Sequence, residues 1–138
     1  MARIAVLDDW QGIAEAAADW SAVRAKAELV FFRDHLGGAE QVVAALQGFD
    51  AVVAMRERTR LSAEVIARLP DLKLLSFTGA RNAAVDVAAC TAQGVVVCNT
   101  TTRRTSHGTA ELTLGLMLAS LRHIAVGDVE MRAGRFQG

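Results

Sequence analysis

The chain contains five short apolar runs that alternate with stretches of helical character, and this alternation constrains the fold more than any other feature. The runs occupy residues 4–7, 29–32, 51–55, 72–77 and 95–98. Continuous apolar runs of this length are typical of strands in a parallel sheet that is covered by helices on both faces. We therefore predict an α/β domain: a flavodoxin-like, doubly wound, five-stranded parallel sheet.

The segments between the runs are predicted to form helices. They cover residues 13–27, 40–46, 62–69 and 85–93. Ser62 is a residue type that caps helix starts, Pro70 stops the third helix, and Gly94 is suited to end the fourth. Right-handed crossovers through such helices connect parallel strands.

Open parallel sheets bind ligands beyond the carboxyl ends of their strands. In this chain the five apolar runs are followed by the pairs Asp8-Asp9, Arg33-Asp34, Arg56-Glu57, Thr78-Gly79 and Asn99-Thr100. We expect the functional residues at this edge of the sheet.

The last third of the chain has a different pattern. Residues 106–131 are predicted to form one long helix, about 39 Å at 1.5 Å per residue. Its apolar residues occupy most of the circumference, which predicts cover on more than one side by a partner. Central packing against the sheet is the alternative. The predicted organisation is thus a domain over 1–105 and a long helix with linker over 106–138.

Charge and composition exclude several classes of protein. The 138 residues correspond to one domain. Its 15 basic residues balance 15 acidic ones, so the protein has no net charge that would attract nucleic acid. The sequence has no uncharged apolar run of about 18 residues, which is the length that predicts a membrane span. Acidic residues follow position 7, too early for the apolar core of a signal peptide. We expect a cytoplasmic protein that binds neither nucleic acid nor membrane.

The cysteines and histidines show no metal-ligand spacing. Cys90 and Cys98 lie in apolar stretches and are predicted to be reduced core residues. His107 near the start of the long helix is a titratable group, but no second acid or base stands at diagnostic spacing, so it receives no catalytic role. The chain also lacks G-x-G-x-x-G, the P-loop and G-x-S-x-G, which excludes a self-contained Rossmann enzyme.

The segment over residues 76–82 is the strongest candidate site. Small residues after a strand present backbone N–H groups to an anion, and Arg81 adds a planar fork suited to a carboxylate. An ordinary strand-to-helix turn with a solvated arginine is the alternative. Arg56, Arg58 and Arg60 alternate after the third run and would share a side if that strand continued; a solvated basic loop is again the alternative.

Asp8 and Asp9 suggest a comparison with response-regulator receiver domains, which share the predicted topology and carry an acidic pair at this place. Met55 and Arg56 stand where the phosphoacceptor aspartate belongs, and Asn99 follows the fifth run in place of a lysine. Without an acceptor there is no phosphotransfer, so only the fold analogy is kept.

Several segments together resemble the N-terminal half of the D-isomer-specific 2-hydroxyacid dehydrogenases, in that family's order and spacing. They are Met55-Arg56-Glu57-Arg58-Thr59, Leu72-Lys73-Leu74-Leu75, Gly79-Ala80-Arg81-Asn82 with Asp86, Gln93-Gly94-Val95-Val96-Val97-Cys98-Asn99-Thr100, Thr109-Ala110-Glu111-Leu112-Thr113-Leu114, Leu116-Met117-Leu118 and Arg122-His123-Ile124.

The resemblance implies a substrate domain made from both chain ends, with a Rossmann coenzyme domain inserted between them. Residues 134–138 correspond to the linker into that domain, and the family's catalytic Arg, Glu and His have no counterpart in this sequence. The resemblance therefore implies a fragment or truncated relative without the coenzyme domain. It assigns no catalytic residue to the chain, which is expected to be inactive alone, although the full-length protein would be an NAD(P)-dependent oxidoreductase.

The resemblance also implies which residues bind ligands. The substrate-binding positions are Arg56, Thr78, Gly79, Ala80 and Arg81, and the positions beside the nicotinamide are Thr105 and Ser106. Most family members have a second glycine where Arg81 stands, so this chain adds a charge there. The implied substrate is a small 2-oxo or 2-hydroxy carboxylic acid. NAD or NADP would bind only with the coenzyme domain.

The sequence thus predicts the substrate-binding part of a D-2-hydroxyacid dehydrogenase, which transfers hydride between a nicotinamide cofactor and a 2-oxo acid. The expected partner is the coenzyme domain of the same chain, and the apolar helix leaves a homodimer open. The alternative function is a non-enzymatic, flavodoxin-like carboxylate-binding or interaction module.

Overall fold

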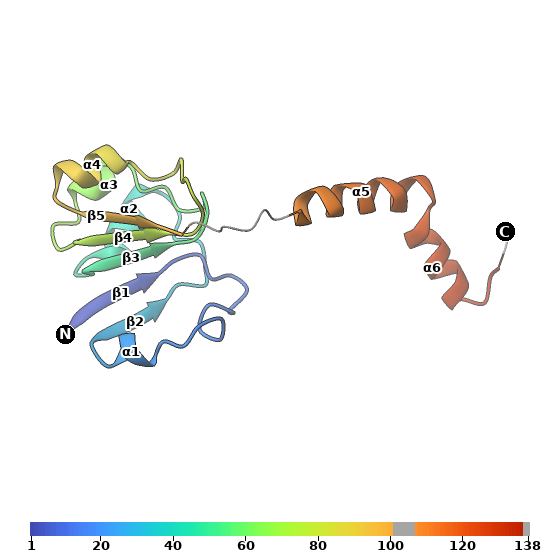
Figure 1. Ribbon diagram of the computed structural model, residues 1–138, viewed down its shortest axis with the longest axis horizontal. Helices are drawn as coiled ribbons and strands as arrows, with labels where there is room; N and C mark the ends of the chain where they lie inside the picture. Colours follow the sequence, from blue (N-terminus) through green and yellow to red (C-terminus); the bar gives the residue numbers. More distant parts are fainter. Residues whose placement is uncertain (101–106, 137–138) are drawn as a thin grey trace. The chain divides into compact units, whose positions relative to one another are not determined.

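A computed structural model describes residues 1–100 and 107–136. The chain divides into two units, Met1–Thr102 and Arg103–Gly138. The first unit is built on one five-stranded sheet in the order β2-β1-β3-β4-β5 (Figure 1). Its strands are β1 (Ala2–Val6), β2 (Ala27–Phe31), β3 (Ala51–Ala54), β4 (Leu74–Phe77) and β5 (Val96–Asn99). Every pairing is parallel, so the predicted flavodoxin-like sheet is confirmed.

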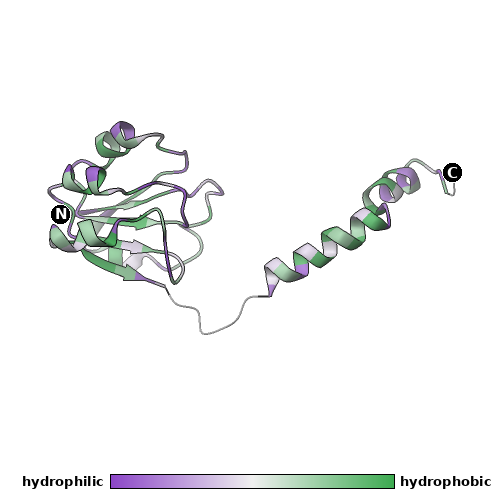
Figure 2. Ribbon diagram, turned by 90° about the horizontal axis from the view of Figure 1, so that it is seen from above, coloured by the Kyte–Doolittle hydropathy of each residue, from purple (hydrophilic) through white to green (hydrophobic). Residues whose placement is uncertain are grey.

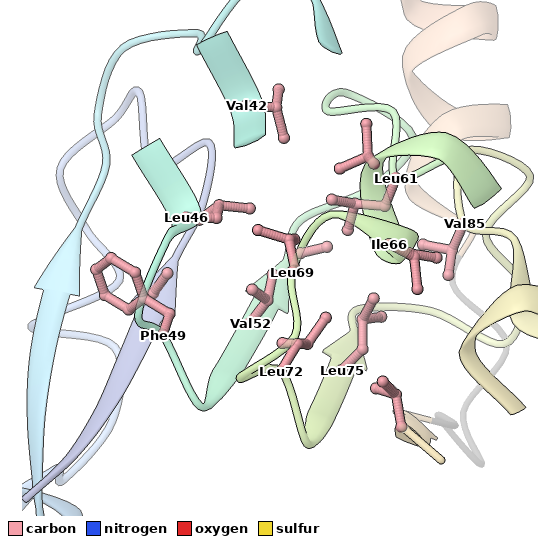
Figure 3. Close-up of a cluster of buried hydrophobic side chains, with 14 of the residues drawn as sticks. Val42, Leu46, Phe49, Val52, Leu61, Ile66, Leu69, Leu72, Leu75 and Val85 are labelled. Carbon is pink, nitrogen blue, oxygen red and sulfur yellow. The ribbon is translucent and has the colours of Figure 1, made fainter. Parts of the chain in front are cut away.

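Helices α2 (Ala39–Leu46), α3 (Ala63–Ala67) and α4 (Val87–Ala92) pack on one face of this sheet (Figure 1). Side chains alternate across a strand, so every second residue of β3 and β4 faces these helices. Figure 3 shows the resulting core, whose labelled members are Val42, Leu46, Phe49, Val52, Leu61, Ile66, Leu69, Leu72, Leu75 and Val85.

The opposite face of β4 and β5 is more open than the sequence predicted. Leu74 pairs with Val96, and these side chains are 37% and 60% exposed. On this side of the sheet the short helix α1 (Ser21–Arg24) contacts β2. The expectation of helices on both faces therefore holds only in part within the unit Met1–Thr102.

The helix predicted over residues 13–27 is wrong for most of its length, since α1 has only four residues. Local hydrogen bonds replace helix there: the Asp19 carboxylate accepts from Ser21 N–H at 2.9 Å, and the Trp20 indole donates to the Ala14 carbonyl at 3.0 Å. Trp20 also packs edge-on against Phe31 of β2. Aspartate that bonds nearby backbone competes with helix in this way.

The other helices match the prediction more closely. Helix α4 begins at Val87 because the Asp86 carboxylate caps it, accepting from Ala89 N–H at 2.9 Å. Ser62 stands at the N-cap of α3, but its side chain makes no capping hydrogen bond.

The predicted long C-terminal helix is present but is divided into α5 (Gly108–Leu121) and α6 (Ile124–Arg132). The break falls at Arg122 and His123, and His123 has a left-handed backbone with φ 51°, which no α-helix accommodates. No single helix in the described ranges is both long and apolar enough to cross a membrane; α5 and α6 reach that length and composition only as a pair bent by 60°.

Helix α5 has hydrophobic residues around its circumference (Figure 2). None of the described residues of α5 or α6 is buried, and Leu121 is 74% exposed. The apolar pattern that predicted cover on several sides therefore belongs to a helix whose side chains are exposed in this structure.

Both cysteines are free, but only one is a core residue. Cys90 is fully buried, and this burial, with the nearby Asp86 carboxylate, raises the pKa of its thiol. Cys98 is exposed, so the prediction of two core cysteines is wrong for it: its position in β5 places it on the open face of the sheet, opposite Ser76.

Leu74 and Leu75 are neighbours on opposite faces of β4 and form a matched pair for testing this core. Leu75 is fully buried, whereas Leu74 is 37% exposed. Leu75→Ala should lower the free energy of unfolding by about 2–5 kcal/mol, since it leaves a cavity. Leu74→Ala should lower it by less than about 1 kcal/mol. Urea unfolding followed by circular dichroism measures both, and equal losses would contradict the assignment of the two faces.

Candidate functional site

The loops after β3 and β4 are joined at the carboxyl edge of the sheet by the side chain of Asn82. Its amide nitrogen donates to the Arg56 carbonyl at 2.7 Å, and its amide oxygen accepts from Ala84 N–H at 2.9 Å. Asn82 is only 7% exposed. Arg56 has a left-handed backbone with φ 58°, and its N–H donates to the Thr78 hydroxyl at 3.2 Å. These bonds fix where Arg56 emerges from the loop.

The loop after β4 is bonded in the same way to the end of β5. Gly79 N–H donates to the Thr100 hydroxyl at 2.9 Å, and the Asn99 side chain donates to the Ala80 carbonyl at 2.9 Å. Gly79 has φ +100°, a conformation that glycine adopts without strain. Thr78 N–H is also engaged, with the Ala54 carbonyl at 3.1 Å.

These internal bonds leave a smaller set of donors for a ligand than the sequence suggested. The N–H groups of Thr78 and Gly79 are used within the protein. Those of Ala80, Arg81 and Asn82 have no acceptor among residues 1–100 and 107–136. Arg56 and Arg81 are exposed, and neither forms an ion pair within the same ranges. Successive free N–H groups are suited to an anion, and an arginine side chain can add a charge-assisted hydrogen bond.

The structure therefore brings together Arg56, Thr78, Gly79 and Ala80 of the predicted substrate-binding set, with Arg81 next in the chain. Thr105 and Ser106, the predicted cofactor-binding residues, lie outside the described residues.

The three alternating arginines do not share a side, because β3 ends at Ala54. The loop turns instead, and Arg58 reaches the end of β1, where it donates to the Asp8 carbonyl at 3.0 Å. Its guanidinium lies 5.3 Å from the centre of the Trp10 ring. This distance is typical of a cation–π contact.

Asp8 and Asp9 are buried, which sequence reasoning did not predict. The Asp8 carboxylate accepts from the Thr59 hydroxyl at 2.8 Å. One Asp9 oxygen accepts from the N–H groups of Ile13 and Ala14 at 3.0 and 3.1 Å, while the other oxygen has no partner in the part of the chain that is described. Two acidic residues directly after an apolar strand were the only signal available, and they indicate the strand end but not burial.

Metal and dinucleotide sites are not supported by the residues present. Among residues 1–100 and 107–136, no group of three or more His, Cys, Asp or Glu could hold a metal ion. The sequence has no G-x-G-x-x-G, the turn that lets backbone approach a pyrophosphate.

The fold is an open parallel α/β domain, and the loop after its fourth strand has backbone N–H groups without an acceptor among the described residues. A family model described as "D-isomer specific 2-hydroxyacid dehydrogenase, catalytic domain" matches residues 5–133. The chain belongs to this family.

Two curated relatives show the range of similarity. A D-3-phosphoglycerate dehydrogenase from Mycobacterium leprae is 41% identical over 93 residues, which cover 67% of this chain and 17% of that protein. A hydroxypyruvate reductase from Thermotoga maritima is 33% identical over 86 residues, 62% of this chain and 28% of that protein. The chain thus matches less than a third of the length of each.

Solved structures agree with this assignment. A phosphoglycerate oxidoreductase from Vibrio cholerae is similar with a TM-score of 0.81 and 31% identity, over 100% of this chain and 43% of that one. A putative D-3-phosphoglycerate dehydrogenase from Ralstonia solanacearum has a TM-score of 0.78 and 34% identity, over 99% and 40%.

Asn82 and Asn99 provide a matched test of how this edge is held together. Asn82→Ala removes a buried amide and leaves the Arg56 carbonyl without its donor, so it should lower the free energy of unfolding by about 1–3 kcal/mol. Asn99→Ala removes one exposed hydrogen bond and should lower it by less than about 1 kcal/mol. Chemical denaturation compares the two variants. An Asn82→Ala variant as stable as the original chain would refute the role given to this amide.

Proposed function

We propose that this chain is the substrate-binding part of an NAD(P)-dependent D-2-hydroxyacid dehydrogenase, and that it binds the carboxylate of a small 2-oxo or 2-hydroxy acid. Hydride chemistry belongs to the nicotinamide cofactor, which a coenzyme domain of the same protein would hold. The residues of this chain bind and orient the acid. By itself the chain is expected to show no turnover.

The observation that carries this proposal is the set of donors after β4. The N–H groups of Ala80 and Arg81 follow one another without an internal acceptor among the described residues. A carboxylate has two oxygens, so it can accept from both N–H groups or from one of them and a guanidinium. Arg56 in the loop after β3 and Arg81 in the loop after β4 are both exposed.

The rigidity of the surrounding loops supports the same proposal. Asn82 fixes the Arg56 backbone and Thr100 fixes Gly79. Donors that are already in position lose little entropy when a ligand binds, which favours affinity for a small acid. Orientation of the acid is also what a bound carboxylate contributes to catalysis, because it places the adjacent carbon for reaction.

Calorimetric titration with oxalate, a non-reacting dicarboxylate, tests the site. Arg81→Ala should weaken oxalate binding about tenfold, since a charge-assisted hydrogen bond contributes about 1.5–3 kcal/mol and about 1.4 kcal/mol is a factor of ten. Arg56→Ala should act in the same direction. Arg60→Ala is the matched control, because Arg60 is an exposed arginine of the same loop that the proposal does not use.

Two results would refute the proposal. One is oxalate binding that Arg56→Ala and Arg81→Ala leave unchanged. The other is oxidation of NADH by the chain alone in the presence of a 2-oxo acid, because the proposal assigns the nicotinamide cofactor to a coenzyme domain.

A further inference from the structure

A hollow lies at the same edge of the sheet, around the ends of β1 and β2. It has a volume of about 360 Å³ and is lined by Asp8, Trp10, Arg33, His35 and Arg58. None of these residues belongs to residues 78–82, the loop after β4 that is proposed to bind a carboxylate. Cavities that bind small ligands have volumes of about 300–1,000 Å³, so this one is large enough for a small organic molecule.

The two arginines of this hollow are available for an anion. Arg58 is held in place by its hydrogen bond to the Asp8 carbonyl at 3.0 Å and its contact with the Trp10 ring. The Arg33 guanidinium lies over Gly12, where an added Cβ would be 3.5 Å from its carbon. Within residues 1–100 and 107–136, neither arginine forms an ion pair with a carboxylate.

The acidic residue in the lining presents little of its carboxylate to a ligand. The Asp8 side chain is only 4% exposed. One of its oxygens accepts from the Thr59 hydroxyl, and the other lies 3.8 Å from the His35 Nδ1. Because the carboxylate is covered and already partnered, a ligand meets mainly the guanidinium groups and the exposed imidazole of His35.

Trp10 gives the hollow an apolar wall. This side chain is 62% exposed, although removing the apolar surface of an indole ring from water is favourable. The hollow therefore combines a large aromatic surface with two guanidinium groups, and this combination suits a molecule that is charged at one end and apolar at the other.

We propose that the hollow of Asp8, Trp10, Arg33, His35 and Arg58 is a second binding site, which takes a small organic anion. The carboxylate or phosphate group of the ligand binds Arg33 and Arg58, and its apolar body lies against Trp10. This site goes beyond the proposed function, since it shares no residue with the loop after β4 and does not require hydride transfer.

Trp10 itself reports on this site. The chain has two tryptophans, so Trp20→Phe leaves Trp10 as the only one. Its fluorescence is titrated with cyclohexanecarboxylate and cyclohexyl phosphate, which share the body and differ in the charged group, and with cyclohexylmethanol, which lacks the charge. The two anions should change the emission saturably, and the tighter of them identifies the charged group. The alcohol should bind at least tenfold more weakly.

Variants of Arg33 locate the binding. Arg33→Ala should weaken binding of the anion about tenfold, and Arg33→Lys should retain part of the affinity because it keeps the charge. Arg81→Ala should leave binding unchanged, which separates this site from the carboxylate loop. Circular dichroism checks that Trp20→Phe is folded, and calorimetry on the chain with both tryptophans repeats the titration if it is not.

Three results would overturn the proposal. The first is an anion affinity that Arg33→Ala leaves unchanged, and the second is an alcohol that binds as tightly as the anions. The third is that neither fluorescence nor calorimetry detects saturable binding of the anions. The oxalate titration is independent of all three, so the two sites can fail separately.

Discussion

A parallel sheet places the carboxyl ends of all its strands at one edge, and this constraint determines where the chain can bind anything. Helices α2, α3 and α4 bury one face of the sheet, and the buried side chains of β3 and β4 hold these two strands in register. The loops that follow them are then close enough for Asn82 to bond the Arg56 carbonyl across 26 positions of sequence. The candidate carboxylate site depends on this register, since Arg56 comes from the loop after β3 whereas Arg81 and the free N–H groups come from the loop after β4.

The edge contains two arrangements of different character. After β4, the place proposed for a carboxylate is defined by backbone N–H groups that have no acceptor among the described residues. At the ends of β1 and β2, arginines surround an aromatic wall above a covered carboxylate. The loop after β3 serves both: Arg56 stands near the first and Arg58 lines the second. Because Arg58 lines the second site and the Arg56 backbone is bonded to the loop after β4, a change in this loop can alter both.

The sheet was predictable from the sequence because each buried strand is a continuous apolar run, and the order of runs and helices allows few topologies. The absence of helix over most of residues 13–27 was not predictable from composition. The alanines of this segment favour helix, but Asp19 and Trp20 form specific hydrogen bonds that replace it. The break at His123 depends on one left-handed residue, which no periodicity indicates.

The position of the candidate loop after β4 was predictable, but the N–H groups that it leaves free were not. Residues 78–82 were identified from small residues after a strand, and the family match agrees with the resemblance that singled them out. Which N–H groups remain available depends on the hydrogen bonds that Gly79 N–H donates to Thr100 and that Thr78 N–H donates to Ala54, both distant in sequence. The hollow at Trp10 depends on Arg58 crossing to Asp8, which required the three-dimensional path of the loop.

The most direct test of the account is nuclear magnetic resonance of the ¹⁵N-labelled chain during titration with oxalate. The account predicts that the amide signals of Ala80, Arg81 and Asn82 shift together and saturate with one dissociation constant, because their N–H groups surround the bound carboxylate. Saturable binding of oxalate that leaves these three amide signals in place, with the shifts gathered on other loops, would contradict it.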